Sequence, residues 1–172
     1  MNKKIAAAPV KEIALAIAAV VALAPGAAVW AADSDSHFVS FTIAAINEID
    51  VATAPVNLTV NTAVAGSQPN SVSAPSSYSI TTNAAADSKK ISARLDTAMP
   101  ANVTLQVNVT APSAGSTSAG AVTLTATDVE VVGSIEGVVA SGVGINYTLS
   151  ATVAAAPTAG SKEVFYTIAD DT

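Results

Sequence analysis

The sequence contains no cysteine and a single histidine, His37, among its 172 residues. Disulfides and cysteine nucleophiles are therefore excluded, and so is a structural zinc site, which needs several Cys or His ligands. Nucleophilic catalysis of the Ser-His kind needs a histidine base near the nucleophile. The only candidate begins an extended segment, where a solvated or half-buried strand residue is the expected role. We therefore predict that the protein is not an enzyme and holds no cofactor.

Basic residues are also scarce. The chain has 7 Lys and Arg residues against 13 Asp and Glu residues, which gives a formal net charge of −6. Residues 1–31 contain three of the lysines and one glutamate, so the remainder carries a net charge of −8. Without a basic cluster to neutralise phosphates, neither nucleic acid nor an anionic membrane surface is an expected partner.

Aromatic residues and metal-ligand patterns are few. Carbohydrate-binding platforms need exposed aromatic faces, and only Phe38 and Phe165 lie opposite the core residues of their predicted strands. Carboxylates occur in spaced pairs that could give one Ca²⁺ ion two ligands, but two carboxylates make a poor site, and solvated strand ends explain them. These pairs are Asp33 with Asp35, Glu48 with Asp50, Asp128 with Glu130, and Asp170 with Asp171.

Four Asn-X-Thr sequons also occur, at Asn57, Asn102, Asn108 and Asn146. They matter only in a host that glycosylates exported proteins, and alternating strand residues produce them by chance.

The first 31 residues have the pattern of a helical signal peptide. A basic start precedes the apolar run 13–24, the Pro25-Gly26 pair interrupts it, and Val29 and Ala31 are small residues at a cleavage site. We predict export, with cleavage after Ala31, which leaves 141 residues and no membrane segment. The alternative is a retained anchor, because apolar residues continue to Ala32.

The rest of the chain alternates apolar and polar residues with period two, which is typical of half-buried strands. In "ANVTLQVNVT" every second residue from Val103 to Val109 is apolar. The same pattern predicts strands in 55–64, 78–82, 89–95, 101–110, 121–127, 144–153 and 162–168. Small polar residues with Pro and Gly predict loops at 65–77 and 111–120 and turns at 132–137 and 140–144. We expect an all-β domain over 47–172, an antiparallel immunoglobulin-like sandwich of eight or nine strands, with a closed barrel as the alternative.

Residues 32–46 predict a separate N-terminal strand whose apolar side chains are Val39, Phe41, Ile43 and Ala45. Burying the three large ones would contribute about 1.5–3 kcal/mol each. A strand with this much apolar surface is not expected to remain in water. It completes its own sheet, or it is donated to the open sheet edge of another subunit.

Three segments resemble the major pilins of alternate chaperone–usher fimbriae of the colonisation-factor type. They are "HFVSFTIAAINEIDV" at 37–51, "ITTNAAADSKKISARL" at 80–95 and "APTAGSKEVFYTI" at 156–168, although "SKEV" departs from the Gly-Tyr-Ser character expected there. The resemblance implies an immunoglobulin-like fold that lacks a strand, with Val39, Phe41, Ile43 and Ala45 as donor-strand residues.

The function expected from this resemblance is an exported structural subunit of a surface filament. Its partners would be further copies of itself and an assembly chaperone met in the periplasm, in transit to the cell surface. Two alternatives stay open. One is a self-contained secreted sandwich of an extracellular matrix or surface layer, and the other is a small carbohydrate- or ligand-binding domain.

Overall fold

The computed structural model describes residues 34–172, so the predicted signal peptide at 1–31 lies outside the described residues. The chain divides into two units, Met1–Phe41 and Thr42–Thr172. Every regular element between residues 34 and 172 is a strand, and no helix in this range could cross a membrane. The prediction of an all-β chain is confirmed for this part of the sequence.

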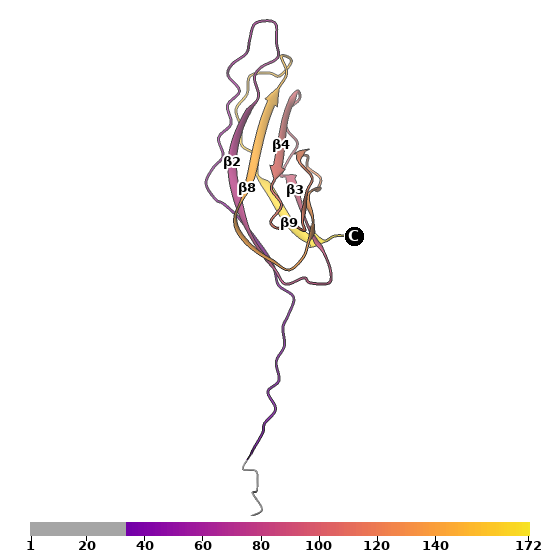
Figure 1. Cartoon of the computed structure of the whole chain (residues 1–172). Helices are drawn as coiled ribbons and strands as arrows, with labels where there is room; N and C mark the ends of the chain where they lie inside the picture. The colour runs from indigo at the N-terminus through magenta and orange to yellow at the C-terminus, as the bar shows by residue number, and fades with distance from the viewer. Residues whose placement is uncertain (1–33) are drawn as a thin grey trace, which may run out of the picture. The chain divides into compact units, whose positions relative to one another are not determined.

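Nine strands in the described residues form two antiparallel sheets (Figure 1). The five-stranded sheet has the order β1 (Asn47–Val51), β2 (Val72–Thr82), β8 (Val138–Ala151), β4 (Val103–Val109) and β6 (Ala121–Thr123). The four-stranded sheet has the order β5 (Thr117–Ser118), β7 (Val129–Ile135), β3 (Lys89–Leu95) and β9 (Val164–Asp170). The chain therefore forms two sheets and not the single closed barrel that was the alternative.

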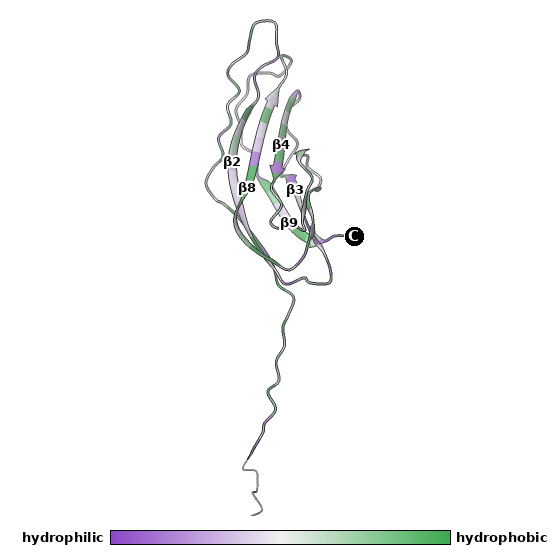
Figure 2. Cartoon of the chain, viewed as in Figure 1, coloured by the Kyte–Doolittle hydropathy of each residue, from purple (hydrophilic) through white to green (hydrophobic). Residues whose placement is uncertain are grey.

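The alternating side chains of both sheets meet in one apolar core. In β3 the buried residues are Ile91, Ala93 and Leu95, and the residues between them are more exposed. In β8 the buried residues Ile145 and Tyr147 flank the exposed Asn146, and Figure 2 shows green and purple stretches along this strand. The remaining core residues are Tyr78, Ile80, Leu105, Val107, Val109, Leu124, Val131, Val132, Ile135, Val138, Ile145 and Tyr147.

Residues 117–123 connect the two sheets on one side of this core. The short β5 pairs with β7 in the four-stranded sheet, and three residues later β6 pairs with β4 in the five-stranded sheet. Gly120 has a φ of 76°, which only glycine adopts readily, and it lies where the chain passes from one sheet to the other. The edges β1 and β9 lie at the other ends of the two strand orders.

The turn predicted at 140–144 is wrong and the turn predicted at 132–137 is only partly right, because both segments include bulged strand residues and only residues 136–137 connect β7 to β8. Strand β8 continues through 140–144, with an extra residue opposite β2 and a φ of 64° at Gly142. Strand β7 continues to Ile135, and Ser134 has a φ of 55° in a region of shifted register. The Ser134 amide donates to the Asp171 carboxylate at 2.8 Å, which satisfies a backbone group that the ladder leaves free.

The predicted loops at 65–77 and 111–120 are also partly wrong. Strand β2 begins at Val72 and includes Pro75, which lies in the part of β2 that pairs with β8 but not with β1. Proline is tolerated there because one side of the strand needs no ladder donor. Within 111–120, residues 117–118 form β5.

The strand predicted at 55–64 is not formed as a paired strand. Its alternation is nevertheless present, since Val56, Leu58 and Val60 are half-buried and Asn57 and Thr59 are exposed. The sequence pattern therefore gave the correct face for these side chains, but it could not show that residues 55–61 lack a backbone partner in the described chain, while Ala63 forms only an isolated bridge with Pro69.

We expect Leu95→Ala to lower the free energy of unfolding by about 2–5 kcal/mol, because Leu95 is fully buried and its truncation leaves a cavity. The matched control is Val139→Ala on β8, whose side chain is 81% exposed and whose substitution should change stability by less than about 0.5 kcal/mol. Urea unfolding of the two variants measures the difference. Equal losses would contradict the position of the core.

Candidate functional site

Two sheet edges of the domain have unpaired backbone groups. Among the described strands, β1 pairs only with β2, and β9 pairs only with β3. After β1 the Ala52 amide still donates to the Ser77 carbonyl at 2.9 Å, but residues 53–61 make no backbone–backbone hydrogen bond within the described part of the chain. Such edges are ready to pair with an additional strand.

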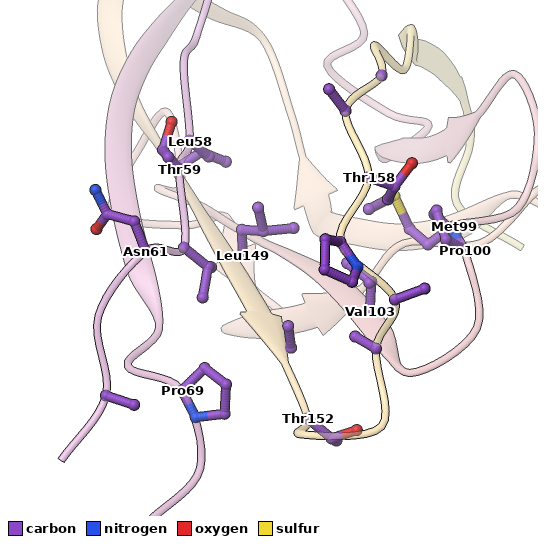
Figure 3. A pocket seen from close by; sticks show the side chains of 18 of the residues that line it. Leu58, Thr59, Asn61, Pro69, Met99, Pro100, Val103, Leu149, Thr152 and Thr158 are labelled. Atoms are coloured by element: carbon purple, nitrogen blue, oxygen red, sulfur yellow. The ribbon is translucent and has the colours of Figure 1, made fainter. Parts of the chain in front are cut away.

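A groove begins beside Val51 at the end of β1 and Val164 at the start of β9, and it continues along the segments that follow β1 and precede β9. Figure 3 shows the part of it that Leu58 and Met99 line. One part of it, about 720 Å³ in volume, lies between residues 58–63 and residues 155–162, and Met99, Val103 and Leu149 line it as well. A second part, about 510 Å³, lies between residues 51–58 and residues 162–166. Leu58 and Lys162 line both parts, so we treat them as one feature and call it the edge groove.

The second part of the edge groove contains a hydrogen bond between the two sheets. Tyr147 of β8 and Tyr166 of β9 line it together with Leu105, and their hydroxyl oxygens are 2.7 Å apart. Burial raises the pKa of both phenols, and the nearby Tyr147 raises that of Tyr166 further. The pair therefore stays neutral and joins β8 to β9 beneath the groove.

Charged side chains are few at the edge groove. Lys162 and Glu163 are its ionisable members apart from the two tyrosines, and the Lys162 ammonium donates to the Thr97 hydroxyl. At the far end of β9, Lys89 forms an ion pair with Asp170, and the hydrogen bond and charge of Lys89 lower the pKa of that carboxyl. The groove is thus suited to apolar side chains and backbone groups.

The predicted donor residues Val39, Phe41, Ile43 and Ala45 are all exposed. Residues 34–46 belong to no strand, and the exposed fractions of Val39, Phe41 and Ile43 are 74%, 84% and 78%. Five of the eight exposed large apolar residues in the described structure fall within residues 38–46, so exposure of this kind is concentrated in one segment. The donor role itself stays a prediction.

The other candidate residues are not brought together. His37 is exposed, and residues 34–172 contain no group of three His, Cys, Asp or Glu side chains that could hold a metal ion. The Phe165 ring is covered by the Arg94 guanidinium at 4.4 Å from its centroid, so it does not present a free stacking face. Arg94 also lies 3.7 Å from an Asp128 carboxylate oxygen.

The carboxylate pairs and the sequons also remain separate surface features. Asp170 pairs with Lys89 while Asp171 accepts from Ser134, so these neighbours have different partners. Asp33 lies outside the described residues. The asparagines of the four sequons, Asn57, Asn102, Asn108 and Asn146, are all exposed.

Sequence reasoning identified the exposed segment but missed the edge groove. Residues 51–63 and 155–166, which form its two walls, are separated by almost the whole domain, and no local pattern predicts that they face one another. One local signal was present: alternation at 55–61 between proline- and glycine-containing segments, which described a half-buried strand whose partner was unspecified.

Neither the protein-family models nor the curated proteins compared with this sequence give a match. The edge groove and the exposed residues 38–46 are therefore the features from which a function can be inferred.

We expect stability to fall as the pH rises above about 10, the ordinary pKa of tyrosine, because the unfolded chain then loses phenolic protons that the folded chain keeps. Burial raises the pKa of Tyr78, which donates to the Thr110 carbonyl at 2.7 Å, to about 12. Stability should be insensitive to these groups below pH 10 and should decrease between pH 10 and 12. Urea midpoints measured from pH 8 to 11.5 test this.

Tyr78→Phe is the control for the alkaline effect. The variant should be less stable at pH 8, because the Thr110 carbonyl loses its donor, but its stability should fall less steeply above pH 10 than that of the unaltered protein. An identical slope in both proteins would show that Tyr78 is not protected from ionisation.

Proposed function

We propose that the protein is an exported structural subunit of a surface filament. In this proposal, residues 37–43 of one copy enter the edge groove of the next copy as an additional strand. The observation that carries the proposal is that one chain combines an exposed apolar segment with a groove that begins beside two unpaired sheet edges. Strand addition would bury the exposed segment and fill the groove, because main-chain hydrogen bonds supply affinity and alternate side chains fill pockets.

The dimensions of the segment support this match. Residues 37–43, when extended at about 3.3 Å per residue, span roughly 23 Å. The wall of the edge groove runs from Val51 to Ala63, so it is long enough to face the whole segment. The donor would present Val39, Phe41 and Ile43 to the groove, while Ser40 and Thr42 would face solvent. Ala45, the fourth predicted donor residue, lies between Ala44 and Ile46, which are hydrogen-bonded to Asn83 of their own chain.

The edge groove and the donor segment both present apolar side chains. The groove is lined by Leu58, Leu105, Leu149 and Val164, among others, which offer contacts to aliphatic and aromatic side chains. Burying three large donor side chains would contribute roughly 5–9 kcal/mol before the cost of ordering the segment. An exposed apolar patch of this kind usually marks an interaction site.

The fold is interpreted within the same proposal. Residues 117–123 connect the two antiparallel sheets on one side, and the sheets end at β1 and β9 on the other. We interpret this arrangement as an immunoglobulin-like sandwich that lacks one strand. The strand contributed by a neighbour would complete it. An assembly chaperone would cover the groove in transit, after cleavage of the signal peptide at 1–31.

The first test uses the double variant Phe41→Glu/Ile43→Glu, which introduces two charges into the donor face while leaving the edge groove intact. We expect the unaltered protein to form polymers that are visible by electron microscopy and elute early in size-exclusion chromatography, and the variant to remain monomeric. The matched control is Val64→Glu/Val153→Glu, two exposed valines outside residues 38–46. A stable monomer of the unaltered protein at high concentration would refute filament assembly.

A second test separates the groove from the donor. A chain that lacks residues 32–46 should be less stable than the intact chain and should regain stability when a peptide of residues 36–46 is added, because the peptide fills the open groove. A peptide with Glu at positions 41 and 43 should have no effect. Stabilisation of equal size by both peptides would argue against side-chain recognition.

A further inference from the structure

The backbone immediately before β1 is held by a single residue, Asn83. The Ile46 amide donates to Asn83 Oδ1 at 2.8 Å, and Asn83 Nδ2 donates to the Ala44 carbonyl at 2.8 Å. The Asn83 backbone amide also donates to the Ile46 carbonyl at 3.2 Å. One residue therefore makes three hydrogen bonds to a stretch of three residues.

These contacts extend the pairing of β1 with β2 beyond the last residue pair of the ladder. Asn47 is opposite Thr82, and the Thr82 hydroxyl, which is buried, donates to Asn47 Oδ1 at 2.7 Å. One position further on, the carboxamide of Asn83 takes the place of a peptide group, with its acceptor facing an N–H and its donor facing a C=O. We call Ala44, Ala45, Ile46 and Asn83 the junction clamp.

We propose that Asn83 is a positioning residue for assembly. The junction clamp holds residues 44–46 as a continuation of β1, so that free rotation of the N-terminal segment begins before Ala44 and not at Asn47. This inference rests on the proposed function, because it assigns the clamp a role at the connection between a donated strand and the domain that donates it.

The position of the clamp explains what it would do there. Residues 39–43 carry the large donor side chains, and the clamp begins at the next residue, so only a very short connection separates the inserted strand from the fixed backbone. In a filament, the stiffness of that connection would set the bending of one subunit against the next. Asn83 is exposed and lines neither part of the edge groove, so its substitution leaves the groove intact.

The test begins with Asn83→Ala and measures hydrogen exchange at the Ile46 amide in the full chain, assigned by NMR under conditions where it is monomeric. We expect exchange to be roughly three- to tenfold faster than in the unaltered protein, because that amide loses its acceptor. Asn108→Ala, on an exposed position of β4, is the matched control and should change nothing at Ile46. Unchanged exchange in Asn83→Ala would overturn the inference.

The second readout is the persistence length of filaments seen by electron microscopy. Asn83→Ala filaments should be more flexible than those of the unaltered protein and of Asn108→Ala. Asn83→Asp keeps the acceptor for Ile46 but loses the donor to Ala44, so it should retain Ile46 protection and show intermediate flexibility. Faster exchange with unchanged filament stiffness would reduce Asn83 to a structural role and overturn the assignment.

The two proposals fail in different ways. If the unaltered protein forms no filaments, the proposed function fails, and the exchange measurement on the monomer still decides whether Asn83 holds residues 44–46. If filaments form and both readouts are insensitive to Asn83, only the positioning role fails.

Discussion

Unpaired backbone at a sheet edge is the constraint on which the rest of this structure depends. Every sheet that is not closed has two edges, and an exposed edge invites pairing with another strand. On one side of this domain the edges are the short strands β5 and β6, and residues 117–123 connect the four-stranded sheet to the five-stranded sheet there. On the other side β1 and β9 have no such connection in the described chain, and the edge groove begins beside them.

The absence of cysteine makes this open side more important. A domain without disulfides depends on packing, and the core of this one is built from β-branched and aliphatic side chains with two buried tyrosines. Leu149 and Val164 pack against that core while also lining the groove. A strand inserted between the walls would therefore add apolar contacts to the same core, and assembly and stability would be coupled.

Local patterns predicted much of the fold because they report which face of a strand is buried. The segment 89–95 forms β3 with its predicted inward residues buried, and 101–110 contains β4 with Val107 and Val109 in the core. Gly142 lies in a bulge but gave a turn prediction, because a positive φ is needed both in turns and in bulged strands. A single sequence does not distinguish the two uses.

Pairing is the property that the sequence did not predict, and the candidate site consists of it. The alternation at 55–61 correctly placed Val56 and Leu58 toward the core, yet it also implied a partner strand that the described chain does not provide. Likewise, the apolar run at Val39–Ile43 predicted burial, and the structure shows those side chains exposed. Both discrepancies have the same form: a strand pattern without a partner among residues 34–172.

The direction of the chain affects whether residues 37–46 could pair with the groove wall of their own molecule. The groove wall begins at Val51 and continues toward Ala63, whereas the N-terminal segment precedes β1 at Asn47. To lie along that wall, residues 37–46 would have to reverse direction next to Asn47. Asn83 holds Ala44 and Ile46 at that point, in line with the β1–β2 ladder, and a reversal would cost those hydrogen bonds. A second copy offers the same groove without that cost, which favours donation between molecules over insertion within one.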